Sequence, residues 1–212
     1  MSVQTLSDIL IDVNAFVDLE AKAPVGDELD TRSNYASQTI RDAADVGQLP
    51  EFSNVYEVNS GTSFTVALPT GFREFEANPK QLVSGTWNDF PEILPKERYN
   101  KSTGEKYCYI TGNPAVGYVA NFSNLDINCT ISFTYQCFPT GFPTLSSKCE
   151  LRDSTYVVTG VESYILQARG SDKFPYVDSI RKNKLKNMFG RAMKSPGGQV
   201  RVAPSGFKNP LG

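Results

Sequence analysis

The sequence predicts an α+β protein: helices from both ends of the chain form a helical bundle, a central antiparallel β-rich insertion separates them, and an extended basic C-terminal arm follows. Three observations lead to this class. Apolar residues recur at three- and four-residue steps near both ends, they alternate with polar residues in the middle, and a basic stretch with many Pro and Gly residues closes the chain. We therefore expect N-terminal helices in residues 1–50, the insertion in 51–148, C-terminal helices in 149–194 and the arm in 195–212.

The first fifty residues predict two amphipathic helices. An apolar stripe runs through residues 6–17, with Thr5 as the expected N-cap and Asp8 favourably placed in the first turn. The sequence Ala-Pro-Val-Gly at 23–26 ends this pattern, and a second helix is expected over 27–46. The residues expected on the inner face of the second helix are Leu29, Ala36, Ile40, Ala43 and Ala44.

The middle of the chain predicts short strands joined by turns. The strongest pattern lies at 130–138, where apolar residues alternate with Thr, Ser and Gln, as in an antiparallel sheet with one packed face. Residues 85–95 have the composition of a loop, and we expect Trp87 in this loop to cover the core. The expected strands are at 64–68, 107–112, 116–122 and 130–138. The packed face of the strand at 64–68 is expected to hold Phe64, Val66 and Leu68. The packed face of the strand at 130–138 is expected to hold Ile131, Phe133, Tyr135 and Cys137.

Helical spacing returns after Cys149. Asp153 or Ser154 can cap a helix that ends at residues 169–170. Pro175 is suited to the first position of a last helix. The residues expected to face inward are Val157, Val161, Tyr164, Ile165 and Ala168 in the first of these helices and Val177, Ile180, Leu185, Met188 and Ala192 in the second.

The composition restricts the function classes. The 212 residues are 40% hydrophobic, which is enough for a core, and none is histidine, so the commonest catalytic base and metal ligand is missing. No apolar run approaches the roughly 20 residues that cross a bilayer, and no secretion signal is visible, so we expect folding in a cytoplasm without membrane contact. Phosphate-binding glycine loops and nucleophile motifs are missing too, so we expect neither an enzyme nor a cofactor. We expect reduced, apolar roles for the four cysteines, Cys108, Cys129, Cys137 and Cys149.

The net charge of −2 conceals a strong asymmetry. From Lys173 onward there are nine basic residues and one acidic residue, whereas the preceding chain has 12 basic and 22 acidic residues. Such a basic end fits an acidic protein surface or nucleic acid, and a third interpretation is an ordinary solvated helix face with a loose tail. No motif for specific reading of DNA or RNA accompanies it.

Several short motifs follow one another in a characteristic order. They are Leu-Pro-Thr-Gly-Phe-Arg-Glu-Phe at 68–75, Tyr-Ile-Thr-Gly at 109–112, the strand at 130–138, and Pro-Thr-Leu-Ser at 143–146 before the two final helices. In this order the chain resembles the head-to-tail adaptor proteins of tailed bacteriophages, also called head-completion or connector proteins, over nearly its whole length. The loop at 76–106 is longer, and the β block larger, than in the minimal helical adaptors. The residues that match the turn motif of the family are Leu68, Pro69, Phe72 and Glu74.

The resemblance implies a structural virion protein of the neck or tail. It implies a ring of twelve copies beneath the portal protein. The ring joins the capsid to the next tail protein (nozzle or tube) and lines the DNA channel without sequence-specific contacts. Each copy extends its C-terminal arm onto the portal. The alternative is a β-rich virion module that binds glycans or proteins through Trp87 and the tyrosines and forms no ring. The candidate residues for the portal or oligomer interface are Arg181, Lys182, Lys184, Lys186, Arg191, Lys194, Arg201 and Lys208.

Overall fold

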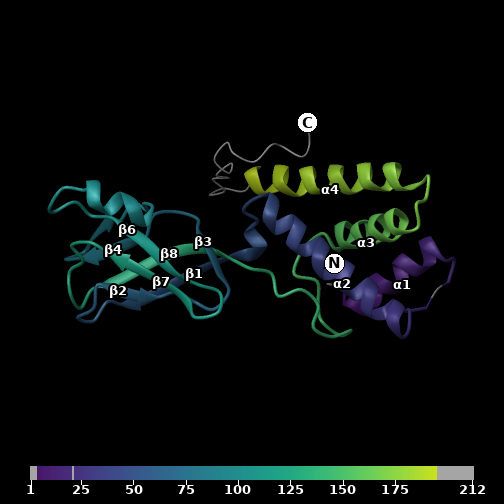
Figure 1. Cartoon of the computed structure of the whole chain (residues 1–212), viewed down its shortest axis with the longest axis horizontal. Helices are drawn as coiled ribbons and strands as arrows, with labels where there is room; N and C mark the ends of the chain where they lie inside the picture. Colours follow the sequence, from purple (N-terminus) through teal and green to yellow (C-terminus); the bar gives the residue numbers. More distant parts are fainter. Residues whose placement is uncertain (1–3, 21, 195–212) are drawn as a thin grey trace. The chain divides into compact units, whose positions relative to one another are not determined.

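The computed structural model describes residues 4–20 and 22–194. These residues belong to two compact units, which Figure 1 draws in sequence colours. The helical unit takes in the described parts of Met1–Glu51 and Pro139–Gly212, and the β unit is Phe52–Phe138. Helices therefore occupy both ends of the described chain and antiparallel sheets occupy its middle, which confirms the predicted α+β class.

Helix α1 (Leu6–Val17) begins with the cap that the sequence predicts. The Thr5 hydroxyl accepts a hydrogen bond from the Asp8 N–H at 3.3 Å, and the Asp8 carboxylate accepts one from the Thr5 N–H at 2.9 Å. This reciprocal pair is a capping box, which satisfies two backbone donors at the start of the helix. The apolar stripe is the packed face as far as Val13, since its buried residues are Leu6, Ile9, Leu10 and Val13. Phe16, expected to continue the stripe, is instead 48% exposed in the last turn.

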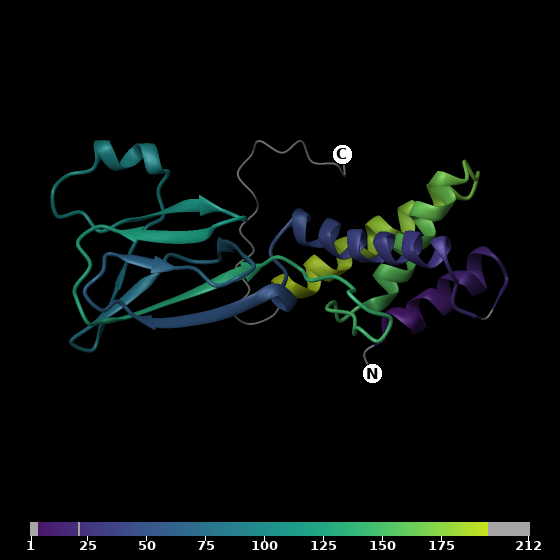
Figure 2. The same cartoon turned by 60° about the horizontal axis from the view of Figure 1, so that its bottom comes forward.

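Helix α3 (Ser154–Ala168) is the centre of the helical unit. It packs against α1, α2 (Asp27–Val46) and α4 (Phe174–Lys194), which Figures 1 and 2 show gathered around it. Gly160 of α3 lies so close to α2 that a Cβ at this position would be 2.2 Å from Thr39 Cγ2. A missing side chain thus permits the close approach of α2 and α3.

Three details of these helices differ from the prediction. Asp153 is the N-cap of α3, but its side chain makes no capping bond and instead accepts from the Thr155 hydroxyl at 2.6 Å. Ala168 is exposed although it continues the apolar stripe, because it is the last residue of the helix, and Leu166 is buried instead. Pro175 is the second residue of α4 rather than the first, where its missing N–H is equally harmless.

The segment that leads from the β unit to α3 belongs to the helical unit, although the predicted insertion extends to residue 148. Its Ser147 carbonyl accepts a hydrogen bond from the Leu6 N–H at 2.9 Å, and the Cys149 N–H donates to the Gln4 carbonyl at 2.9 Å. These bonds align the segment with the start of α1. The parts of the chain before and after the β unit are therefore joined by backbone hydrogen bonds as well as by helix packing.

Strand β8 (Thr130–Cys137) is central in a five-stranded antiparallel sheet. Strand β1 (Ser53–Asn59) pairs with β8 on one side, and β3 (Phe72–Phe75) and β4 (Lys80–Val83) pair with it on the other. Strand β5 (Thr86–Asp89) continues the sheet from β4. Partners on both sides explain why β8 has the clearest alternation in the sequence, because its apolar face is packed along the whole strand.

A second antiparallel sheet shares its core with the first. Its order is β2 (Thr65–Ala67), β7 (Gly117–Phe122) and β6 (Cys108–Asn113), so all four strands expected from the sequence, β8 included, are confirmed. Aromatic rings from the first sheet pack closely in this core; the Phe75 and Phe133 centroids, for example, are 5.0 Å apart in an edge-to-face arrangement. The residues of the core are Val66, Leu68, Phe72, Phe75, Phe90, Cys108, Ala120, Phe122, Leu125, Ile131, Phe133 and Tyr135.

The predicted loop over 85–95 is wrong for residues 86–89, whereas residues 90–94 belong to no helix or strand. Residues 86–89 form β5, which turns back from β4 at Ser84 and Gly85, whose φ angles of 49° and 81° suit a tight hairpin. Trp87 consequently lies on a strand, and it is 45% exposed rather than covering the core. A four-residue strand offers only two positions per face, too few for a periodic pattern to be visible.

Two further expectations about the β unit are corrected. The segment 76–106 is not one long loop, because it contains β4, β5 and a 3-10 helix, η2 (Pro95–Asn100). Phe64 is 53% exposed and does not join the core, because β2 begins only after it. Val66 and Leu68 are buried as expected.

Candidate functional site

The turn motif that carries the resemblance has a structural role in the β unit. Leu68 and Phe72 are buried in the shared core, and the Phe72 N–H donates to the Pro69 carbonyl at 3.0 Å. Gly71 has a φ of 81°, a backbone conformation that residues with a side chain rarely adopt. Glu74 pairs with Gln136 in the register of β3 and β8. The motif therefore directs the chain from one sheet to the other.

Arg181, the first candidate interface residue, is used within the helical unit. Its guanidinium pairs with Asp42 of α2 at 3.2 Å and with Asp178 of α4 at 3.0 Å. It also lies over the ring of Tyr164, whose hydroxyl donates to the same Asp42 carboxylate. Burial, followed by this hydrogen bond to Asp42, raises the pKa of Tyr164. Arg181 thus ties α4 to α2 and α3 and is removed from the exposed basic face.

Lys184 is directed inward in the same way. Its Nζ donates to the Thr155 carbonyl at 3.0 Å and to the Thr159 hydroxyl at 2.8 Å, both on α3. Lys182 pairs with Asp178 at 2.9 Å but remains about half exposed. Only part of the predicted basic face is therefore free to meet a partner.

The exposed cations of α4 are Lys182, Lys186 and Arg191. Lys186 lies one helical turn after Lys182, on the same face. The side chains of Lys186 and Arg191 form no ion pair or hydrogen bond with any other residue that the structure describes. The remaining candidates, the side chain of Lys194 together with Arg201 and Lys208 in the predicted arm at 195–212, lie outside the described residues.

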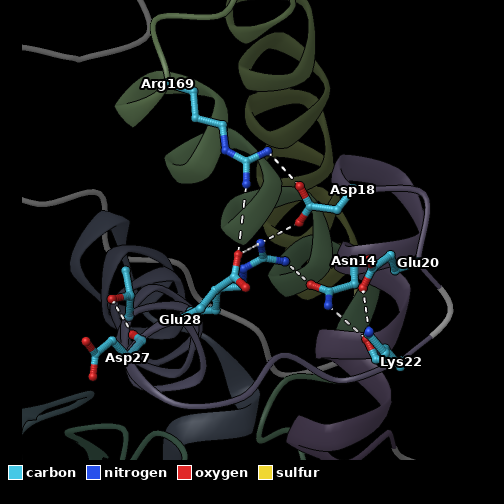
Figure 3. Close-up of polar contacts among 9 residues, drawn as sticks. Asn14, Asp18, Glu20, Lys22, Asp27, Glu28 and Arg169 are labelled. Atoms are coloured by element: carbon cyan, nitrogen blue, oxygen red, sulfur yellow. Dashed lines mark hydrogen bonds and ion pairs between the residues drawn. The ribbon is translucent and has the colours of Figure 1, made fainter.

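A buried arginine network was missed by reasoning from the sequence. Arg32 of α2 is only 2% exposed, and its guanidinium donates to Asn14, Asp18 and Glu28 (Figure 3). Arg169, just after α3, binds Asp18 at 2.8 Å, so the network joins three helices. Hydrogen bonds from Arg169 and then from Arg32 lower the pKa of Asp18. The signal was present, since Arg32 occupies an inner position of the apolar stripe of α2.

Two of the four cysteines, Cys108 and Cys149, are buried. Burial raises the pKa of Cys108 to about 12 and that of Cys149 to about 11, so neither thiol is an activated nucleophile at neutral pH. None of the four cysteines forms a disulfide, and Cys129 and Cys137 are half-buried. Across residues 4–20 and 22–194 the structure shows no group of His, Cys, Asp or Glu side chains that could hold a metal ion. None of the helices in these residues is both long and apolar enough to cross a membrane.

Comparison with protein-family models and with curated protein sequences finds no match for this chain.

Proposed function

We propose that the protein is a head-to-tail adaptor of a tailed bacteriophage. Copies of it form a ring beneath the portal, join the capsid to the next tail protein and line the channel through which DNA passes. The observation that supports this proposal best is the arrangement of the chain: both ends build one helical unit, and a compact β unit is inserted between α2 and α3. This is the organisation that the order of motifs implies, and such a part needs no catalytic centre.

The charge distribution suits the two surfaces that this role requires. Lys182, Lys186 and Arg191 give the exposed side of α4 a positive charge, and the residues after α4 add Arg201 and Lys208. An acidic portal surface would bind this end of each copy, and repetition around a ring multiplies a modest contact into a stable one. The chain before Lys173 carries ten more acidic than basic residues, so acidic surface facing the bore would repel passing DNA.

Cryo-electron microscopy of the full chain mixed with its cognate portal ring tests the proposal. We expect a symmetric collar on one end of the portal, whose symmetry gives the number of copies directly. A bare portal ring beside unbound protein would refute the proposal. Deletion of residues 195–212 should leave the unfolding transition intact and abolish docking; a truncated protein that still forms the collar would refute the role of the arm. The triple change of Lys182, Lys186 and Arg191 to Glu tests the helical part of the contact.

One observation favours the second candidate, a β-rich binding module without a ring. Trp87 is 45% exposed on β5, a position from which an aromatic ring can stack on a sugar. This candidate predicts that the isolated protein binds glycans on an array and that Trp87→Ala abolishes binding. It also predicts that the protein leaves the portal bare, so the same cryo-electron microscopy experiment separates the two functions.

A further inference from the structure

Large apolar and aromatic side chains are exposed on η2 and the residue before it, together with two cations; Glu97 of the same helix accepts the Leu94 N–H at 3.0 Å. Leu94 is 55% exposed and Tyr99 is 77% exposed, and exposed apolar side chains that lie together mark interaction surfaces more often than single ones do. Lys96 is exposed beside them and has no ion pair with a described residue. We call Leu94, Lys96, Arg98 and Tyr99 the η2 patch.

Arg98 makes the η2 patch rigid. Its guanidinium carbon lies 4.7 Å from the ring centroid of Tyr99 and 5.4 Å from that of Tyr109 on β6. The same group donates to both phenol oxygens, at 2.6 Å and 3.1 Å. Side chains that are already ordered lose little entropy on binding, and Tyr and Arg are the residues that most often anchor protein interfaces. The η2 patch therefore has the composition and the preorganisation of a binding surface for another protein.

A second exposed patch, of opposite charge, lies at the connection between α1 and α2. Leu19 and Val25 are 88% and 81% exposed, and Leu19 has a φ of 57°, a strained value for a bulky residue. Asp27 and Asp30 are exposed at the start of α2, and neither carboxylate pairs with a described residue. In Figure 3 Asp27 stands apart from the arginine network. We call Leu19, Val25, Asp27 and Asp30 the α1–α2 patch.

The buried network holds the α1–α2 patch in place. Asn14 accepts from Arg32 and donates through its Nδ2 to the Lys22 carbonyl at 2.8 Å, which ties Lys22 to α1 (Figure 3). Asp18, directly before Leu19, is held by Arg32 and Arg169. The strained and exposed Leu19 is thus presented by an anchored backbone, as in surfaces that are ready to bind.

We propose that the η2 patch of one copy binds the α1–α2 patch of a second copy of this chain. Each patch has an apolar centre, Leu94 and Tyr99 on one side and Leu19 and Val25 on the other, with charges of opposite sign beside it. Two different patches make a heterologous contact, which repeats from copy to copy and closes into a ring or continues as a filament. The inference names the contact between neighbours in the proposed ring, and its biological role rests on that proposed function.

Paired charge reversals in the full chain test this contact. One variant changes Lys96 and Arg98 to Glu, the other changes Asp27 and Asp30 to Lys, and sedimentation velocity measures the association of each. We expect the wild type to associate, and each variant alone to associate at least about 100-fold more weakly because like charges then face each other. An equal mixture of the two variants should associate again, because both kinds of contact in the mixture pair opposite charges. A matched control for the Lys96 and Arg98 variant is Arg41→Glu with Lys148→Glu, which replaces two exposed cations by Glu outside both patches. This control should associate as the wild type does.

A variant without any charge change protects the test against a folding defect. Leu19→Ser with Val25→Ser removes only exposed side chains, so the unfolding midpoint should stay and association should fall. A wild type that remains monomeric at about 200 µM, or a mixture of the reversed variants that remains monomeric, would overturn the contact. A collar on the portal whose neighbours touch through other surfaces would overturn the contact and leave the proposed function standing. A bare portal beside self-associated wild type would overturn the proposed function and leave the contact standing.

Discussion

Glu162 on α3 is a half-buried carboxyl group that should make folding stability depend on pH near neutrality. It forms no hydrogen bond or ion pair with any other described residue. Burial raises its pKa from the ordinary 4.5 to about 7; Lys184 on α4 opposes this shift and Asp12 on α1 adds to it. Lys184 cannot relieve the carboxylate fully, because its Nζ is already bound to two oxygens of α3.

The direction of the effect follows from the raised pKa. The folded state holds the proton of Glu162 more tightly than the unfolded chain, so the contribution of this group to the free energy of unfolding is highest below pH 4.5 and falls as the pH rises toward 7. A shift of this size corresponds to at most about 3 kcal/mol. Solvent reaches part of the side chain, so we expect a loss of about 1–2 kcal/mol.

Glu162→Gln removes the charge and retains the size of the side chain. Urea unfolding of wild type and variant at several pH values, from about pH 5 to about pH 8, measures the difference in their free energies of unfolding. We expect the variant to gain about 1 kcal/mol on the wild type over this interval, because only the wild type ionises in its folded state. The exposed Asp172→Asn provides the control for loss of one negative charge and should show a flat difference. A flat difference for Glu162→Gln would refute the reasoning, since it would mean that the carboxylate is well solvated in the folded state.

Three further changes test the packing. Arg32→Met should lower the free energy of unfolding by about 2 kcal/mol, since Asn14 and Glu28 lose their arginine donor and Asp18 keeps only Arg169. Lys22→Ala at an exposed ion pair should change it by less than about 0.5 kcal/mol, and urea titration measures both. Gly160→Ala should destabilise the protein by about 1–3 kcal/mol because the new Cβ meets α2, whereas Gly190→Ala, in open space on α4, should stabilise it by about 0.5–1 kcal/mol. Thermal unfolding measures both, and equal shifts of the two midpoints would contradict the close approach of α2 and α3. Cys108, with a pKa raised to about 12, should resist thiol reagents in the folded protein and react on unfolding, as mass spectrometry after timed labelling would show.

The parts of the fold that the sequence could predict are those in which one local pattern extends over many residues. Helix α1 has a full apolar stripe and a cap, Thr5, whose partner is three residues away. Strand β8 is packed on one face along its length, so alternation extends through eight residues. Strands β3, β4 and β5 have four residues each and owe their existence to pairing with β8 or with each other, so no local pattern reveals them.

The candidate site was harder to predict, because the sequence shows charges but not the groups that neutralise them. Arg181 seemed part of a free basic face, yet its partner Asp42 is 139 residues away along the chain. Arg32 is buried for the same reason, through partners on α1 that only the fold brings near. A charge is most available to an interface where the fold leaves it without an ion pair, as it does for Lys186 and Arg191 on α4 and for the charges of the two proposed patches. Lys182 pairs with Asp178 but stays about half exposed, so it is available in part. The structure thus turns a broad asymmetry of charge into a small number of side chains whose reversal can be tested one surface at a time.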